Sequence, residues 1–275
     1  MCLLVFAWNA HPRYRLVFAG NRDEFHERPT APMAWWTESD APDGRIDPAA
    51  GGILAGRDLQ AGGTWLGVSR DGRFGVVTNF RDLQKAEPHA PSRGELITRF
   101  LARNVSARQF GDNLAPGAAS YAGFNLLLAD SSDMVYLSNR AMALSRALPS
   151  GIYGLSNHFL DTPWPKLERT RERFKSLMST PDPSPDALLD MLNDREPTLE
   201  HLLPQTGLSR EWELLLSSPF IADERYGTRC STVVTIGHDG QVLVRERRFD
   251  AGGRSTGMDD FTFSTPFRSA NAMPA

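Results

Sequence analysis

The chain has 275 residues, with 30 Lys or Arg against 33 Asp or Glu, so its formal net charge at pH 7 is −3. This near-neutral balance gives no electrostatic footprint for binding nucleic acid or an anionic membrane surface, and a hydrophobic content of 41% is ordinary for a soluble globular protein. The two cysteines, Cys2 and Cys230, are too few for a disulfide framework or for a site of four thiolates around zinc or an iron–sulfur cluster.

The N-terminal segment predicts the cellular compartment. Residues 2–8 are apolar, but no basic residues precede them, and Asn9 and His11 end the run too early for a signal peptide. No run of 18 apolar residues occurs, so we expect no transmembrane helix and no integral membrane association. These features predict a cytoplasmic protein in which both thiols stay reduced.

The first predicted element is a hairpin. Residues 2–8 form a short, continuous apolar run, which is typical of a strand buried on both faces, and a turn over 9–14 leads to a second strand at 15–20. The polar run Asn-Arg-Asp-Glu at 21–24 follows directly, so we expect it at the end of the second strand.

The rest of the chain predicts one α+β domain. Residues 29–63, rich in Pro, Gly and Asp, form an excursion whose tryptophans need burial. Further along we expect strands at 64–69, 73–80, 123–130, 134–139, 152–157, 231–237 and 241–249, and helices at 92–103, 165–178, 184–192 and 211–216. Because the strands come in hairpins and do not alternate with helices, we predict a single domain over 1–250, followed by a partly loose tail over 251–275.

Common motifs for phosphate, metal and serine-nucleophile sites are missing from the sequence. It has no glycine-rich phosphate loop, no H-E-x-x-H and no G-x-S-x-G. The six histidines are scattered singly, so we predict no metal site.

Cys2 is the sharpest candidate for chemistry, because it directly follows the initiator methionine. Methionine aminopeptidases act when the second residue is small, and removal of Met1 would leave a thiol and a free α-amine on one residue. An α-amine has a pKa of about 7.7–8.0 and can act as a base near neutral pH, which is the N-terminal-nucleophile (Ntn) arrangement. The alternative is that Cys2 is a small hydrophobic residue at the start of a core strand.

An acyl transfer also needs hydrogen-bond donors for the oxyanion and positive charge near the thiolate. Four polar places at strand ends qualify: residues 21–24, Asn79, Asn157 and Arg229. Asparagine is unfavourable within strands, so Asn79 and Asn157 suggest a specific role, although turn or cap positions explain them equally well. For the arginines the alternative is an ordinary salt bridge.

Several motifs in chain order resemble one family. They are Met-Cys at 1–2, GNRDE at 20–24, GGTW at 62–65, TNFR at 78–81, SRG at 92–94, GFNLL at 123–127, LSN at 155–157 and YGTR at 226–229. Together they resemble the NRDE family, also called the transport and Golgi organisation family, over residues 1 to about 249. The resemblance implies an Ntn-hydrolase fold, a four-layer αββα sandwich with mostly antiparallel sheets.

A more distant resemblance, to the choloylglycine hydrolases and penicillin V acylases, implies roles for the residues. It implies that Cys2 is the nucleophile, that Asn79 and Asn157 hold the oxyanion and the amine, and that Arg229 supports the nucleophile electrostatically. Arg22 and Asp23 would organise the amine and the thiolate. The resulting expected site comprises the catalytic residues Cys2, Arg22, Asp23, Asn79, Asn157 and Arg229, and the substrate-binding residues Asn21, Trp65 and Arg81.

One departure from those amidases concerns Arg22 and Asp23. They are adjacent here, whereas two residues separate the corresponding pair in the amidases. Neighbours on a regular strand face opposite sides of a sheet. Both side chains can therefore reach Cys2 only if the chain turns or bulges there. If the strand stays regular, Asn21 and Asp23 share one face and Arg22 and Glu24 the other.

Two functions follow from this resemblance. The first is a cofactor-independent cysteine hydrolase acting on a small-molecule amide or related acyl bond. The second is a non-catalytic protein that binds or traffics haem or an acyl lipid, in which a cysteine or histidine ligates the iron. Four tryptophans could then line an apolar pocket, although each is also explained as a core residue: Trp35, Trp36, Trp65 and Trp164. The sequence indicates no oligomeric state.

Overall fold

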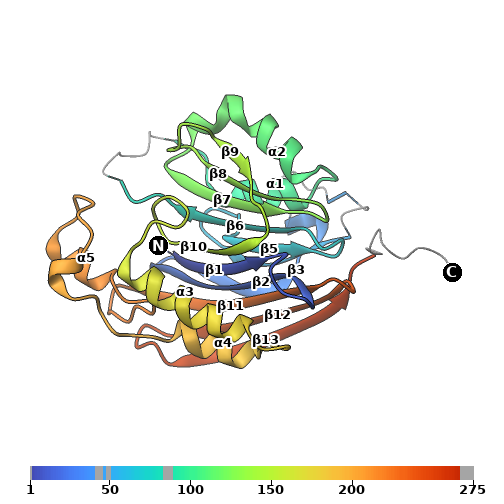
Figure 1. Ribbon diagram of the computed structural model, residues 1–275. Coiled ribbons are helices and arrows are strands. Elements are labelled where there is room, and N and C mark those ends of the chain that lie inside the picture. The colour runs from blue at the N-terminus through green and yellow to red at the C-terminus, as the bar shows by residue number, and fades with distance from the viewer. Residues whose placement is uncertain (1, 41–45, 48–50, 83–88, 267–275) are drawn as a thin grey trace.

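The computed structural model describes residues 2–40, 46–47, 51–82 and 89–266, and two antiparallel β-sheets form its centre (Figure 1). The first sheet has the strand order β10 (Gly151–Leu155), β1 (Cys2–Trp8), β2 (Tyr14–Phe25), β11 (Tyr226–Gly237), β12 (Gln241–Phe249) and β13 (Ser255–Ser264). The second has the order β3 (Thr30–Trp35), β4 (Ile53–Asp58), β5 (Leu66–Ser69), β6 (Phe74–Asn79), β7 (Phe124–Ala129), β8 (Met134–Ser138) and β9 (Ser145–Ala147).

Helices cover the outer face of each sheet (Figure 1). The second sheet is covered by α1 (Gly94–Leu101) and α2 (Ala107–Leu114), and the first by α3 (Pro165–Met178) and α4 (Pro185–Leu192). The short helix α5 (Arg210–Leu215) stands beside the layers (Figure 1). Short 3-10 helices occupy Glu38–Asp40, Ala115–Ser120 and Glu200–Leu202. No helix in these described segments is long and apolar enough to cross a membrane.

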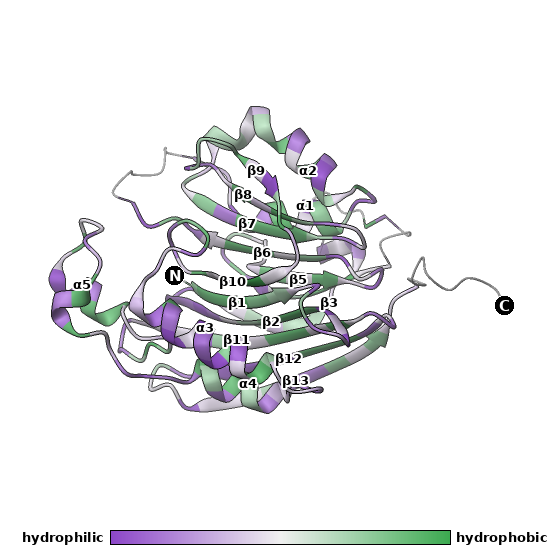
Figure 2. Cartoon of the chain, viewed as in Figure 1, coloured by the Kyte–Doolittle hydropathy of each residue, from purple (hydrophilic) through white to green (hydrophobic). Residues whose placement is uncertain are grey.

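Three apolar layers hold these elements together. One lies between the two sheets, one between the second sheet and α1 and α2, and one between the first sheet and α3 and α4. In Figure 2 the strands are mostly coloured hydrophobic, whereas α3 carries hydrophilic stretches. The α+β, four-layer αββα arrangement predicted from the family resemblance is confirmed.

Strand β1 is buried along its whole length, as its continuous apolar sequence predicted. Leu4 and Phe6 point into the core between the sheets, whereas Leu3 and Val5 pack under the helices. Both edges of β1 are hydrogen-bonded, to β2 and to β10. The strand that carries Cys2 is therefore a buried interior strand of the first sheet.

The polar run at 21–24 lies inside a strand, which corrects its expected place at a strand's end. β2 continues to Phe25, because β1 pairs with it on one side and β11 on the other through the run itself. β11 likewise begins at Tyr226, five residues before the predicted start at 231. The mutual pairing of β2 and β11 overrides the low strand propensity of these polar residues.

Some elements were not predicted. The excursion at 29–63 contains β3 and β4, and α2 and β9 had no expected counterpart. Residues 255–264, placed by sequence in a partly loose tail, form β13 at the edge of the first sheet, where Phe261 and Phe263 pack against the inter-sheet core. These segments carry weak local patterns, and pairing with a neighbouring strand or packing on a sheet defines them.

Candidate functional site

A pocket of about 790 Å³ opens between the two sheets at the end of β1 that carries Cys2. Both sheets, the start of α1 and the segment around α5 line it. Six of the residues expected at the site border the pocket, namely Cys2, Arg22, Asp23, Trp65, Asn79 and Arg229, whereas Asn21, Arg81 and Asn157 do not.

Cys2, Asn157 and Asn79 are joined by hydrogen bonds. The backbone N–H of Cys2 donates to Asn157 Oδ1 at 3.2 Å, and Asn157 Nδ2 donates to Asn79 Oδ1 at 2.8 Å and to the Asn79 carbonyl at 3.0 Å. Ser156 Oγ donates to the carbonyl of Cys2 at 3.1 Å. Asn157 therefore does not line the pocket itself but holds two residues that do, Cys2 and Asn79. Its bonds use the oxygen of the Asn79 side chain, and Asn79 Nδ2 donates to none of the described residues.

Arg22 lies directly opposite Cys2, in β2, and Cys230 lies opposite Arg22, in β11. Directly paired residues share a face of the sheet, so the two thiols flank the arginine on the pocket side. Two strand spacings of about 4.8 Å separate the cysteine backbones, which is too far for a disulfide. Burial raises the pKa of the Cys2 thiol, and the positive charge of Arg22 acts in the opposite direction.

The side chain of Asp23 turns to the other face of the sheet from Arg22, although the residue still borders the pocket at this end of β2. Its Oδ1 accepts a hydrogen bond from the Thr228 hydroxyl at 2.7 Å, and its backbone carbonyl accepts one from the Tyr226 hydroxyl at 2.9 Å. Burial raises the pKa of this carboxyl, and the buried ammonium of Lys166 opposes that shift. The pairing of β1 with β2 is regular here, so Arg22 and Asp23 do face opposite sides.

The bulge lies in the neighbouring strand. Thr228 pairs with Asp23 and Cys230 pairs with Arg22, which leaves Arg229 as the extra residue of β11. Its guanidinium borders the pocket and donates to the carbonyls of Phe25 and Arg28, at 2.9 and 3.0 Å. Arg229 therefore fastens the β2–β3 turn to the rim of the pocket.

Asn21 and Arg81 are buried away from the pocket. Asn21 Nδ2 donates to the carbonyls of Leu192 and Pro219, and its Oδ1 accepts from Ser231. Arg81 forms an ion pair with Glu213. Neither side chain borders the pocket in which substrate binding was expected. Asn21 is hydrogen-bonded to the helical layer, and Arg81 is ion-paired with α5.

Two glycine motifs shape one wall of the pocket. Gly63 and Gly94 bring their backbones together, and a Cβ atom on Gly63 would lie 2.6 Å from the carbonyl carbon of Gly94. α1 accordingly begins at Gly94, with Arg93 at its N-cap, rather than at Ser92. The GGTW and SRG motifs are thus parts of one close contact beside Trp65.

The pocket is rich in arginine. Among the six arginines that border it in the described part of the chain, three are paired with carboxylates, since Arg28 bonds to Asp58, Arg57 to Asp40 and Arg248 to Asp259. Arg93 and Arg229 donate to backbone carbonyls, and Arg22 makes no hydrogen bond or ion pair with the described residues. The group opposite Cys2 is therefore a cation available to a bound molecule.

Sequence reasoning missed several lining residues. Trp212 and Leu208 come from the α5 segment, and Glu246 comes from β12, where it accepts a hydrogen bond from the backbone N–H of Met33 at 3.1 Å. Burial raises the pKa of Glu246 and that of the neighbouring thiol of Cys230. Strand pairing could have placed Cys230 and Glu246 had the register of β11 been known, whereas nothing in the sequence marks Trp212.

The expected tryptophan lining is wrong in three of four cases. Trp65 borders the pocket, but Trp36 is a core residue, Trp35 packs against the inter-sheet core, and Trp164 lies against the Arg81 guanidinium. Among the residues that the structure describes, no cluster of three or more His, Cys, Asp or Glu side chains could hold a metal ion.

Comparisons with known proteins decide the family. Residues 1–251 match the family model described as Transport and Golgi organisation 2. The chain belongs to this family. It is 33% identical over 267 residues to the human Transport and Golgi organization protein 2 homolog, covering 90% of this chain and 92% of that protein, and 25% identical over 263 residues to Transport and Golgi organization protein 2 of Drosophila melanogaster.

A solved structure shows the fold of this family member. A mutant conjugated bile acid hydrolase from Clostridium perfringens superposes with a TM-score of 0.52, covering 98% of each chain, at 7% sequence identity. At that identity the likeness concerns the fold alone, and it agrees with the Ntn-hydrolase arrangement predicted from the sequence.

Proposed function

We propose that this Transport and Golgi organisation 2 family member is a cysteine amidohydrolase whose nucleophile is Cys2, freed by removal of Met1. The supporting observation is the hydrogen-bonded set at the pocket, in which the Cys2 nitrogen bonds to Asn157 and Asn157 bonds to Asn79. That nitrogen becomes the α-amine once Met1 is removed. The set provides a nucleophile, its base and an amide donor in one place.

The reaction follows from these groups. The α-amine of Cys2 takes the thiol proton, and the sulfur attacks the amide carbonyl carbon of the substrate. Asn79 Nδ2 donates to the oxygen that becomes negative, and Arg22, opposite Cys2, stabilises both the thiolate and that oxyanion. The C–N bond then breaks, and the amine leaves with the proton held by the α-amine. Water attacks the resulting thioester, which releases the acid and restores the thiol.

Asn157 holds the geometry of this reaction. Its Oδ1 fixes the Cys2 nitrogen, and its Nδ2 donates to the oxygen of the Asn79 side chain, which leaves the amide hydrogens of Asn79 for the substrate oxygen. Because neighbouring residues on β2 face opposite sides, Arg22 supplies charge on the pocket side, while Asp23 balances the buried charge under α3.

The test uses N-acyl-7-amino-4-methylcoumarins with acetyl to decanoyl groups as probes, and protein whose intact mass shows that Met1 has been removed. Cys2→Ala is expected to abolish fluorophore release, a loss of at least about 1,000-fold, because the covalent route is gone. Cys230→Ala, the matched thiol control on the same sheet face, is expected to retain release. Equal release by wild type and Cys2→Ala would contradict the proposal.

Binding without hydrolysis is the second candidate for the same pocket. For haem, the lining residues fit poorly: none of the six histidines borders the pocket, and burial raises the pKa of both thiols and disfavours the thiolate that iron prefers. Trp65, Trp212 and Phe25 fit an acyl lipid better. Saturable binding of the decanoyl probe with no release by any form of the protein would favour this candidate.

A further inference from the structure

The segment around α5 forms one wall of the pocket without belonging to either sheet. α5 has only six residues, and it stands outside the four layers (Figure 1). Leu208 and Trp212 of this segment border the pocket, and the Trp212 ring packs edge-on against Phe25 and Tyr226, with ring centroids 6.2 and 5.7 Å apart. We call residues 206–213 the α5 wall.

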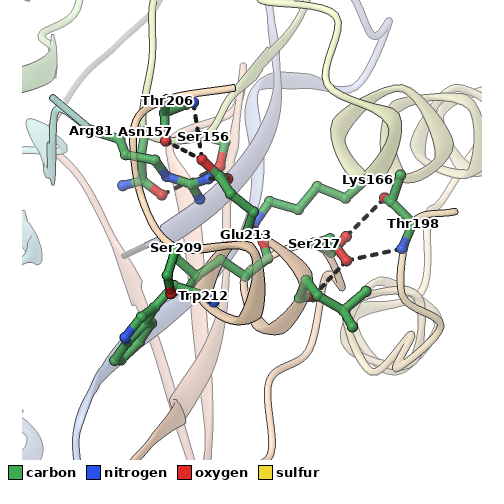
Figure 3. A network of polar contacts seen from close by, with 12 residues as sticks. Arg81, Ser156, Asn157, Lys166, Thr198, Thr206, Ser209, Trp212, Glu213 and Ser217 are labelled. Atoms are coloured by element: carbon green, nitrogen blue, oxygen red, sulfur yellow. Dashed lines mark hydrogen bonds and ion pairs between the residues drawn. The ribbon is translucent and has the colours of Figure 1, made fainter. Parts of the chain in front are cut away.

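A buried carboxylate holds this wall. Glu213 Oε2 accepts a hydrogen bond from Arg81 Nη1 at 2.9 Å, and Glu213 Oε1 accepts the backbone N–H of Thr206 at 3.0 Å (Figure 3). Both partners of the ion pair are almost fully buried, with side chains 3% and 6% exposed. The Arg81 guanidinium also lies 4.5 Å from the centre of the Trp164 ring. Glu213 therefore closes the loop from Thr206 to α5 and joins it to Arg81.

Arg81 in turn lies just beyond the end of β6, whose last residue, Asn79, is the proposed oxyanion donor. It follows Asn79 by two residues, and its backbone N–H donates to the carbonyl of Asn157 at 2.6 Å. Asn157 is the residue that fixes the Cys2 nitrogen. One buried residue, Arg81, thus connects the α5 wall through its side chain and the nucleophile's partner through its backbone.

We propose that Glu213 is a positioning residue: its ion pair with Arg81 holds the α5 wall against the Cys2 site, and this wall provides the subsite for the apolar part of the substrate. That the ligand of this subsite is a substrate rests on the proposed function, whereas the subsite itself needs only an apolar ligand. A merely structural ion pair would affect small and large ligands alike. The positioning role predicts an effect that grows with the length of the apolar group.

Alkylation of Cys2 by a series of N-alkyl iodoacetamides, from ethyl to decyl, measures this subsite without any hydrolysis. The sulfur displaces iodide, and peptide mapping assigns the product to Cys2 rather than Cys230. In the wild type we expect the rate constant to rise with chain length. In Glu213→Gln we expect the ratio of the decyl to the ethyl rate to fall at least about tenfold, since each buried methylene contributes roughly fourfold and the lost burial of two would lower the ratio about sixteenfold. The ethyl rate should stay within about twofold.

Glu211→Gln, on the exposed side of the same helix, is the matched control and should keep the wild-type ratio. A Glu213→Gln variant with an unchanged ratio, or with both rates lowered equally, would overturn the proposal. Should Glu213→Gln fail to fold by circular dichroism, Arg81→Glu is compared with the charge-reversed pair Arg81→Glu with Glu213→Arg. We expect the pair to restore the decyl-to-ethyl ratio that Arg81→Glu alone lowers. A wild-type ratio in Arg81→Glu alone would likewise overturn the proposal. If wild type hydrolysed none of the coumarin probes while the decyl-to-ethyl ratio still fell in Glu213→Gln, the result would count against the amidase and not against the subsite.

Discussion

The two faces of β2 between residues 21 and 24 have opposite characters. On the pocket face, Arg22 lies beside Cys2 and makes no hydrogen bond or ion pair with the described residues. On the helix face, Asn21 is completely buried with three hydrogen bonds, and Asp23 is bonded to Thr228. One face offers a charge to a ligand, and the other is filled by the protein itself.

This difference shows that a run of four polar residues is not one functional unit. Strand alternation divides it, and the bulge at Arg229 in β11 brings a second arginine to the pocket without disturbing β2. The helix face secures the strand, and the pocket face is available for chemistry. Substitutions at neighbouring positions should therefore have different consequences.

The largest expected effect on stability is on the helix face. Asn21→Ala removes three hydrogen bonds and leaves the carbonyls of Leu192 and Pro219 and the hydroxyl of Ser231 without this partner. At about 1 kcal/mol for each bond, the free energy of unfolding should fall by about 3 kcal/mol. Urea unfolding measures it. A loss below about 1 kcal/mol would mean that this face is not the structural one.

Lys166 sharpens the comparison through pH. Burial lowers the pKa of this lysine to about 8, and its ammonium donates to the Leu216 carbonyl at 2.7 Å. Its pKa in the unfolded chain is about 10.4, so between pH 8 and 10 the unfolded chain binds more protons and stability rises with pH. We expect wild type to gain about 2 kcal/mol relative to Lys166→Met between pH 7 and 10.

The measurement is urea unfolding of both proteins at each pH, and the difference between them isolates the lysine from the buried cysteines and tyrosines. Lys175→Met, an exposed lysine on the same helix, is the control and should show no such difference. Parallel pH profiles of the free energy of unfolding for wild type and Lys166→Met would show that burying the Lys166 ammonium does not destabilise the fold.

The sequence predicted the layers of the fold well, and the reasons are visible in particular strands. β1 is continuously apolar because it is buried on both faces, and the hairpin of β11 and β12 has its Asp-Gly turn. β3, β4 and β13 have no such local signal, because pairing with a neighbouring strand defines them. Cys2, Asn79 and Asn157 come together from distant parts of the chain, as the sequence led us to expect, and their roles in chemistry stay predictions.

The sequence could not place contacts that depend on the register between strands or on segments far apart in the chain. Whether Arg81 contacts substrate or Glu213 depends on a residue 132 positions away, and α5 carries no motif. The side on which Asp23 lies depends on whether β2 or β11 carries the bulge, and a single sequence does not distinguish these cases.

The smallest effect on stability, and the clearest on chemistry, is expected for Arg22→Gln on the pocket face. Its side chain has no hydrogen-bond partner among the described residues, so the free energy of unfolding should change by less than about 1 kcal/mol. The arginine lowers the pKa of the Cys2 thiol, so its removal should raise that pKa and slow alkylation by N-ethyl iodoacetamide at a fixed pH near 8.

The rate of alkylation against pH separates this effect from a change in access to the pocket. A higher apparent pKa with an unchanged limiting rate at high pH means that Arg22 acts through its charge, whereas a lower limiting rate means that the pocket has changed shape. Arg248→Gln is the matched comparison, because Arg248 borders the same pocket but is ion-paired with Asp259. If Arg248→Gln shifted the Cys2 pKa as much as Arg22→Gln, the unpaired position opposite Cys2 would have no special electrostatic role.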